Sequence, residues 1–349
     1  MKKIDIKNLV CPHVLNMQAY SSARMEYEGK EGVFLDANEN SLGSVTTEVH
    51  NRYPDPLQAD LKTALAKTVQ LQPNQIFLGN GSDECINVLI QCFCIAGKDK
   101  VIILPPSFSM YEHASRVMNI GLIEVMLKEE TFQLNVDEIL KLSQDNAAKI
   151  IFICSPNNPT GNSINGIEEI LKSFNGGVVV DEAYIDFSEK ESWLKRLNEF
   201  PNLIISQTFS KAWGLAAARV GLAYTNPELI SWFNKVKPPY NVSELNQQEA
   251  LKALEQKDET LKKINLIKSE KIELERNLDS LEIVKKVYPS DGNFLLVEVS
   301  DANKVYEYLT DEKIVVRNRN SVVKNCLRIT VGAPEENVKM LNALQNYKS

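Results

Sequence analysis

The stretch Val178-Val179-Val180-Asp181-Glu182-Ala183-Tyr184 places three consecutive valines directly before a carboxylate. An uninterrupted β-branched run is typical of a strand that is covered on both faces. A carboxylate at the end of such a strand is costly unless a cation or hydrogen-bond donors meet it. Asp181 is therefore either the partner of a positive charge at a binding site or an ordinary helix cap or salt bridge at a strand end.

Further apolar runs occur on both sides of this stretch, including Ile150 to Cys154 and Leu203 to Ser206, and helix-like segments separate them. Apolar strands that alternate with helices predict an α/β fold with a mainly parallel, doubly wound sheet. Ligands of such sheets bind beyond the carboxyl ends of the strands. We therefore expect the chemistry of this protein in the loops that follow these runs.

The pattern changes at about Ser243, where the charged, helix-like stretch Glu244 to Leu278 begins. Short strand-like runs follow it at Phe294 to Val299 and at Ile314 to Arg317. This succession of a long helix and short strands predicts a smaller α+β domain after the large one. The expected organisation is an N-terminal arm (1–33) that packs on the small domain or on a partner subunit, a large domain (34–242) and a small C-terminal domain (243–349).

The composition limits the possible partners. The 349 residues carry a net charge of −7, so nucleic acid and anionic membranes are not expected as partners, because both require a basic face. Any anionic ligand must be held by local positive groups. Asp5 and Lys7 interrupt the N-terminal apolar stretch, so no secretory signal is predicted.

Cysteine and histidine usage points to a reduced, metal-free protein. The six cysteines form no Cys-x-x-Cys pair, which favours free thiols and a cytoplasmic location. The three histidines lack the spacing of metal ligands, so no metal site is expected.

Three loops carry candidate binding residues. Gly79-Asn80-Gly81-Ser82-Asp83-Glu84 follows a predicted strand and opens a helix, where free backbone N–H groups suit a phosphate, although an ordinary capped turn has the same pattern. Ser155 to Gly161 offers an asparagine amide to a ligand oxygen, or is simply a proline-rich turn. Thr208 to Leu215 contains Lys211, with Arg219 eight residues beyond it. Lys211 at this edge of the sheet can act as an amine nucleophile. The alternative is that it is an ordinary solvated lysine in a loop.

These segments occur in order on consecutive strand ends, and that combination is the specific signal. Together they supply a nucleophilic lysine, a carboxylate for a ring nitrogen, a donor to a ring hydroxyl and a phosphate cup, which are the groups that pyridoxal phosphate needs.

At this point the chain resembles the fold-type I, class-II pyridoxal-phosphate aminotransferases, and among them the histidinol-phosphate aminotransferase family. The resemblance covers nearly the whole chain. Its more specific strings are Asp36-Ala37-Asn38-Glu39-Asn40, Arg52-Tyr53-Pro54-Asp55-Pro56 and Leu327-Arg328-Ile329-Thr330-Val331-Gly332.

The resemblance implies a role for each matching residue. Lys211 forms the Schiff base with the cofactor and moves the proton, Asp181 pairs with the ring nitrogen, and Tyr184 and Asn158 bind the ring hydroxyl. The other expected cofactor-binding residues are Ser82, Asp83, Thr208, Ser210 and Arg219 at the phosphate, Tyr111 (or alternatively Phe108) stacked on the ring, and Tyr53 reaching the phosphate from the other subunit of a homodimer. The expected substrate-binding residues are Tyr20, Asn38, Arg317 and Arg328.

The implied reaction transfers the amino group of L-histidinol phosphate to 2-oxoglutarate and gives imidazole acetol phosphate and L-glutamate, in L-histidine biosynthesis. Three alternatives remain open on this fold: an aromatic-amino-acid aminotransferase, a threonine-phosphate decarboxylase and a non-catalytic binding or regulatory protein. A fold alone does not decide between them.

Overall fold

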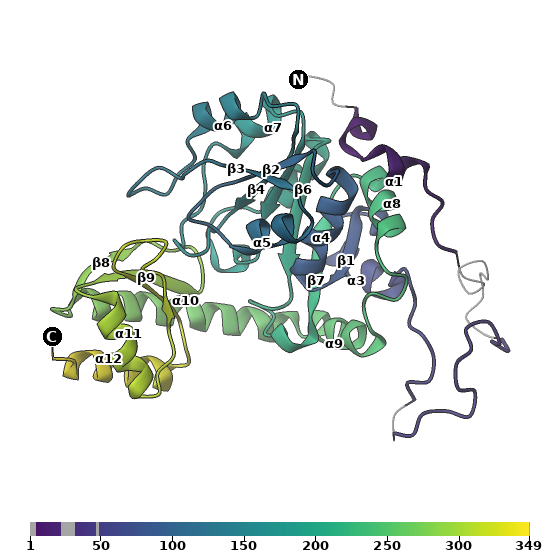
Figure 1. The fold of residues 1–349 in the computed structure, drawn as a ribbon. Helices are drawn as coiled ribbons and strands as arrows, with labels where there is room; N and C mark the ends of the chain where they lie inside the picture. The colour runs from purple at the N-terminus through teal and green to yellow at the C-terminus, as the bar shows by residue number, and fades with distance from the viewer. Residues whose placement is uncertain (1–4, 22–31, 47–48, 349) are drawn as a thin grey trace.

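The structure is a computed structural model that describes residues 5–21, 32–46 and 49–348. Two sheets, one large and one small, lie in separate parts of the molecule, and the long helix α10 runs between them (Figure 1). The large sheet consists of β1 (Ile76–Asn80), β2 (Lys100–Ile103), β3 (Gly121–Glu124), β4 (Ala148–Cys154), β5 (Gly177–Asp181), β6 (Leu203–Thr208) and β7 (Val220–Tyr224). The helices around it are α1 (Pro12–Asn16), α3 (Ala59–Val69), α4 (Ser82–Phe93), α5 (Met110–Val117), α6 (Val136–Leu142), α7 (Ile167–Ser173) and α8 (Pro227–Val236). Short 3₁₀ helices are η1 (Ile6–Leu9), η2 (Pro73–Gln75), η3 (Ile185–Phe187), η4 (Trp193–Glu199) and η5 (Ala216–Ala218).

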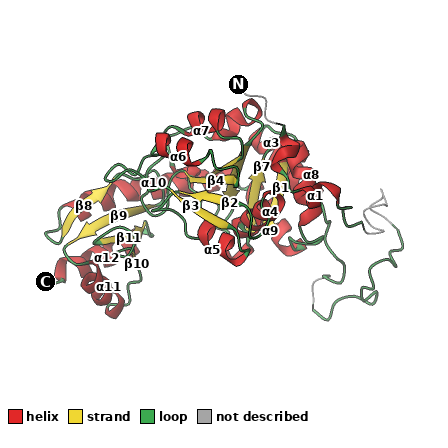
Figure 2. Cartoon of the chain, turned by 45° about the horizontal axis from the view of Figure 1, so that its top comes forward, coloured by secondary structure: helices red, strands yellow, loops and turns green. Residues whose placement is uncertain are grey.

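The large sheet has the strand order β1-β7-β6-β5-β4-β2-β3. The pairs along β6-β5-β4-β2-β3 are parallel, whereas β7 runs antiparallel to both of its neighbours, β1 and β6. The mainly parallel, doubly wound sheet expected from the sequence is therefore confirmed. Helices cover both faces of this sheet (Figure 2).

The valines of β5 show why the strand has no polar face. Val178 and Val180 pack into one core cluster, together with residues of α3, α6 and α7. Val179 points the other way, into a second cluster with residues of α4 and α8. Because successive side chains alternate between the two faces, burial of both faces requires an apolar residue at every position.

The small sheet is antiparallel, with the order β10-β11-β9-β8. The remaining elements are α9 (Glu244–Glu255), α10 (Lys257–Asp279), β8 (Val284–Tyr288), β9 (Phe294–Val299), α11 (Ala302–Asp311), β10 (Arg317–Asn318), β11 (Cys326–Thr330) and α12 (Pro334–Asn346). The strand expected at Ile314 to Arg317 is shorter and later than predicted. Ile314 and Val316 pack on the core under α11 and α12, and pairing with β11 begins only at Arg317.

Residues 5–17 of the N-terminal arm pack on the large domain and not on the small one: Leu9 and Val14 are buried with residues of α4 and α8. The expected packing of the arm on a partner subunit stays a prediction. The backbone N–H of Cys11 donates to the carbonyl of Cys92 at 2.8 Å. These apolar side chains fix this part of the arm to the large domain, while residues 1–4 and 22–31 lie outside the described part of the chain.

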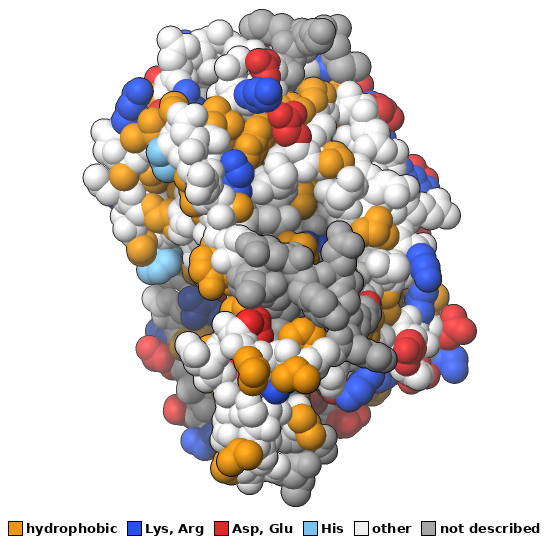
Figure 3. Space-filling model, turned by 90° about the vertical axis from the view of Figure 1, so that its right-hand side faces the viewer, with side chains coloured by type: hydrophobic (Ala, Val, Ile, Leu, Met, Phe, Trp, Pro, Cys, Tyr) orange, Lys and Arg blue, Asp and Glu red, His pale blue; other side chains and the backbone are white. Residues whose placement is uncertain are grey.

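The segment that follows the arm stands away from the body of the molecule (Figure 1). This segment and the last residue of the arm expose large apolar side chains almost fully: Val33, Leu35, Leu42, Val45 and Val49. Hydrophobic side chains are scattered widely over this side of the molecule (Figure 3). Among the described residues, no helix is both long and apolar enough to cross a bilayer.

Candidate active site

A cavity of about 270 Å³ opens where β4, β5 and β6 end and α4 begins. It brings together most of the site residues expected from the sequence. The expected residues that line it are Ser82, Asp83, Phe108, Asn158, Asp181, Tyr184, Thr208, Ser210, Lys211, Arg219 and Arg328.

Asp181 is the last residue of β5 and is buried at the bottom of this site. The hydroxyl of Tyr111 donates to its Oδ2 at 2.6 Å, and the backbone N–H of Ala183 donates to its Oδ1 at 3.1 Å. Burial raises the pKa of Asp181, and these two hydrogen bonds oppose that rise. A buried carboxylate with only two donors gains from a cation, so Asp181 fits the protonated nitrogen of a pyridine ring.

Tyr111 does not have the position that the resemblance led us to expect. Its ring is buried and stacked on Phe152, with centroids 4.6 Å apart and planes at 4°. Phe108 lines the cavity instead and meets Tyr111 edge to face. The geometry therefore favours Phe108 as the residue that packs on a bound ring, while Tyr111 orients Asp181.

Lys211 lies in the loop after β6, with its Nζ 5.6 Å from the centroid of the Tyr184 ring. The residue keeps contact with solvent at the cavity mouth. Burial of the amine, and then the charge of Arg328, lower the pKa of Lys211, while Asp181 opposes the shift. A lower pKa increases the fraction of neutral amine, which is the nucleophilic form.

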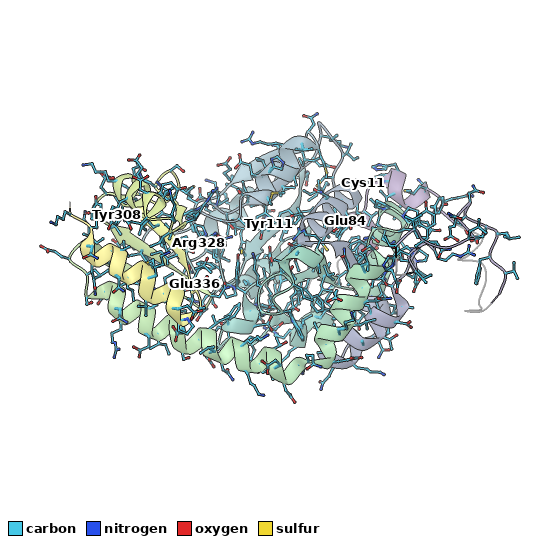
Figure 4. All side chains as sticks on the ribbon, turned by 90° about the horizontal axis from the view of Figure 1, so that it is seen from below. Cys11, Glu84, Tyr111, Tyr308, Arg328 and Glu336 are labelled. Atoms are coloured by element: carbon cyan, nitrogen blue, oxygen red, sulfur yellow. The ribbon has the colours of Figure 1, made fainter. Side chains whose placement is uncertain are left out.

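Arg328 connects the small domain to the large one. From β11 its Nη1 donates to Oδ1 of Asn158, and the Nδ2 of Asn158 donates to the hydroxyl of Tyr184 at 3.4 Å. The guanidinium also lies 5.4 Å from the ring centroid of Phe294. In Figure 4, Arg328 lies on the side of the small domain that faces Tyr111 and the large domain. The cavity is thus closed by a cation that an anionic substrate could bind.

The start of α4 forms an anion cup. Gly81 precedes the helix with φ +78°, and a Cβ on it would lie 2.4 Å from Nη2 of Arg219. The hydroxyls of Thr208 and Ser210 line the same wall and lie 3.0 Å apart. Arg219 forms an ion pair with Asp83 at 3.2 Å. Free N–H groups, two hydroxyls and one guanidinium suit a phosphate.

Besides Tyr111, four expected residues do not line this cavity. Tyr53 is half exposed and stacks on Tyr240, with centroids 4.4 Å apart. Tyr20 and Asn38 are exposed outside it. Arg317 lies opposite Arg328 on the neighbouring strand but lines a different cavity. For these four residues, the roles implied by the resemblance remain proposals.

Glu84 has a structural role that its sequence context did not indicate. Its Oε2 accepts hydrogen bonds from the backbone N–H of Asn80 and from Nδ2 of Asn241 at 2.8 Å. Glu84 thereby holds the glycine loop in place from below. The only signal was its position in the first turn of a helix, where acidic residues are common for other reasons.

Comparison with known proteins places the chain in a family. The family model described as aminotransferase class I and II matches residues 26–344. The histidinol-phosphate aminotransferase of Parabacteroides distasonis is 49% identical over 348 residues, which is 99% of this chain and 99% of that protein.

Solved structures with the same fold include two different activities. The histidinol-phosphate aminotransferase of Sinorhizobium meliloti, in complex with pyridoxal-5'-phosphate, superposes with a TM-score of 0.78 at 23% identity and covers 88% of this chain and 89% of its own. The L-threonine-O-3-phosphate decarboxylase of Porphyromonas gingivalis superposes with a TM-score of 0.71 at 23% identity, over 85% of this chain and 90% of its own. The fold is therefore common to both chemistries, and the family assignment comes from the sequence match. The chain belongs to the pyridoxal-phosphate-dependent aminotransferase class I and II family, and within it to the histidinol-phosphate aminotransferases.

Proposed function

We propose that this protein transfers the amino group of L-histidinol phosphate to 2-oxoglutarate, in L-histidine biosynthesis. The observation that supports this most strongly is the full-length match at 49% identity to an enzyme of that name. The cavity agrees with it, because Lys211, the buried carboxylate of Asp181 and the guanidinium of Arg328 line it together. Bound there, pyridoxal phosphate supplies a ring that withdraws electrons from the substrate carbon.

Residues of this chain carry out the proton transfer and hold the ring. Lys211 Nζ takes the proton from the carbon that bears the amino group, because its lowered pKa leaves more of the amine neutral. Asp181 keeps the ring nitrogen protonated, because a buried carboxylate stabilises a cation beside it. Asn158 and Tyr184, already joined by a hydrogen bond, hold the ring oxygen.

Arg328 is the proposed site for the anionic end of both substrates. Its contact with Asn158 places the guanidinium beside the ring site, and no acidic group pairs with it among the described residues. It would bind the phosphate of histidinol phosphate in one half-reaction and a carboxylate of 2-oxoglutarate in the other.

The test compares three amines in separate reactions: L-histidinol phosphate, L-phenylalanine and L-threonine O-3-phosphate. The proposal expects glutamate to form from 2-oxoglutarate fastest with L-histidinol phosphate, and no release of CO₂. Faster turnover of phenylalanine would make the protein an aromatic aminotransferase. Release of CO₂ from the threonine phosphate would make it a decarboxylase.

We also propose that the protein acts as a homodimer with shared active sites. The exposed apolar side chains of residues 33–49 need a partner surface, and Tyr53 follows them in the chain, half exposed. A hybrid of a Lys211→Ala chain and a Tyr53→Ala chain tests this. If Tyr53 acts on the partner's site, one site of the hybrid is intact and activity returns. If Tyr53 acts within its own chain, the hybrid stays as inactive as its parents.

A cytoplasmic location is proposed as well. All six cysteines are free thiols, as is usual in a reducing compartment. Cell fractionation would test it, and recovery of the protein in an oxidising compartment would contradict it.

A further inference from the structure

A second cavity, of about 510 Å³, lies on the small domain and shares Arg328 with the active-site cavity. It lies between β11, the chain before β10 and the start of α12. Figure 4 shows Arg328 and Glu336, which both line it, at the edge of the small domain that faces the large one. The two cavities are therefore neighbours on either side of one arginine.

The cavity exists because a strand pair separates. Arg317 pairs with Arg328 and Asn318 with Leu327, so continued pairing would set residues 315 and 316 opposite Thr330 and Ile329. Instead, residues 314–316 leave β11, and Lys313 adopts a left-handed conformation with φ +62°. The gap between the separated segments is the cavity, and it leaves Lys313 on its rim.

The charge of the lining is strongly positive. Lys313, Arg317, Arg328 and Lys339 line the cavity together with one acidic residue, Glu336. The Oε2 of Glu336 already accepts a hydrogen bond from the backbone N–H of Ala333 at 2.8 Å. Over the described part of the chain, none of the four cations forms an ion pair. Four uncompensated cations stand out in a protein whose net charge is −7.

A fifth cation increases this imbalance. Arg317 and Arg328 are directly opposite each other on neighbouring strands, an arrangement that is destabilising for like charges. Arg319 follows two residues after Arg317, and its Nε is buried with no hydrogen-bond partner within the described residues. Burial, and then the charges of Arg328 and Arg317, lower the pKa of Arg319. A bound anion would relieve the repulsion within this group.

We propose that the small-domain cavity is an anion site that attracts phosphate monoester dianions and passes them to Arg328. Lys313 and Lys339 line this cavity and not the active-site cavity, so they are the residues that distinguish it. The identity of the natural ligand rests on the proposed function, whereas the anion site itself does not. A positive hollow beside an active site raises the local concentration of an oppositely charged substrate and its association rate. The effect should therefore appear in kcat/KM and depend on ionic strength.

The test is a Lys313→Gln/Lys339→Gln double variant of the cofactor-loaded enzyme. At low ionic strength, kcat/KM for L-histidinol phosphate should fall about three- to tenfold, with kcat unchanged, and its dependence on salt should flatten. The control, Lys262→Gln/Lys304→Gln, removes the same charge from ion pairs elsewhere on the surface and should behave as wild type. A Lys313→Arg/Lys339→Arg variant should keep the wild-type value, because the charge is retained.

A second readout does not require turnover. Inorganic phosphate, titrated calorimetrically into the same three proteins, should bind more weakly to the glutamine variant than to the control. Equal phosphate affinity and equal kcat/KM in the glutamine variant and the control would overturn the anion site, even if the enzyme acts on histidinol phosphate. Weaker phosphate binding in an enzyme that ignores histidinol phosphate would support the site and reject the proposed substrate.

Discussion

At the scale of single residues, the pKa values of Asp181 and Lys211 shift in opposite directions. Burial raises the first and lowers the second, so in each case burial acts against the charged form. A protonated ring nitrogen reverses this for Asp181, because a carboxylate beside a cation is stabilised in its charged form. The role proposed for Asp181 therefore requires a ring that carries a positive charge.

Tyr111→Phe should make this carboxylate harder to ionise. The hydroxyl of Tyr111 lowers the pKa of Asp181, so its loss lets the pKa rise further. We expect kcat to fall about tenfold, since one hydrogen bond to a charged group is lost, and the acidic limb of the pH–rate profile to move to higher pH. A profile that superposes on that of the Tyr306→Phe control would contradict the role given to Tyr111.

Glu182 should make stability depend on pH. It is buried, accepts hydrogen bonds from Ser192, Trp193 and Gln207, and burial raises its pKa to about 7. Because its pKa is higher in the folded state, the folded protein binds the proton more tightly, and stability falls as pH rises from about 4.5 through 7. The total loss is roughly 3 kcal/mol.

Glu182→Gln removes this titration, so its melting temperature should vary less with pH over that range than the wild type's does. The exposed Glu169→Gln variant serves as the control and should keep the wild-type slope. An unchanged slope in Glu182→Gln would show that another group is responsible.

The sequence alone predicted the site residues that come at or just after the ends of strands. Asp181 and Lys211 each come after an apolar strand, and all parallel strands of a sheet end at one edge. The sequence could not show whether Phe108 or Tyr111 packs on a bound ring, because this depends on how the start of α5 is oriented against β4. That orientation is set by the stacking of Tyr111 on Phe152, which is a contact between segments far apart in sequence.

At the scale of elements, the anion cup depends on the close approach of β7 to the turn before α4. A Cβ on Gly221 would lie 2.2 Å from the backbone carbon of Gly81. β7 pairs antiparallel with β1 and so carries Gly221 opposite Gly79. The absence of side chains at these crossing points lets Arg219, the residue before β7, reach over the glycine loop.

Gly221→Ala should therefore push the loop away from β7 and weaken the cup. We expect a loss of about 1–3 kcal/mol in stability, as for other overpacked sites, together with weaker retention of the cofactor. Gly121→Ala on β3 is the control, because the nearest atom to its Cβ is the side-chain Cγ of Lys100 at 2.9 Å, and that side chain is 42% exposed and can move aside. If Gly221→Ala keeps the wild-type melting temperature and cofactor content, the close approach of β7 to the glycine loop is not required for the cup.

The elements that the sequence misjudged were those shaped by tertiary contacts. The run Ile314 to Arg317 is β-branched like a strand, yet Ile314 and Val316 pack on the core under α11 and α12, and most of the run stays unpaired. The N-terminal arm has no periodicity that could indicate where it packs, and its place on α4 and α8 depends on the burial of Leu9 and Val14 among apolar residues far away in sequence.

At the scale of the whole molecule, the active site is completed by a side chain from the small domain. Arg328 reaches Asn158 across the boundary between the two domains, and the sequence separation of 170 residues hid this contact. In the role proposed for it, this single cation would let a histidinol phosphate and a dicarboxylate share one site.

Arg328→Ala should weaken both half-reactions, because both substrates present an anion there. We expect the KM values for L-histidinol phosphate and for 2-oxoglutarate each to rise roughly ten- to a hundredfold, as for the loss of charge-assisted hydrogen bonds. If only one of the two KM values rises, the substrates do not share this arginine.

The most direct test of the central claim is the absorption spectrum of the purified, cofactor-loaded enzyme during addition of L-histidinol phosphate without a keto acid. The account predicts that the visible band of the bound cofactor disappears, that a near-ultraviolet band grows, and that 2-oxoglutarate restores the first spectrum. It also predicts no such conversion in Lys211→Ala with an unchanged melting temperature. A visible band that does not respond to L-histidinol phosphate, or a Lys211→Ala variant that converts normally, would contradict the account.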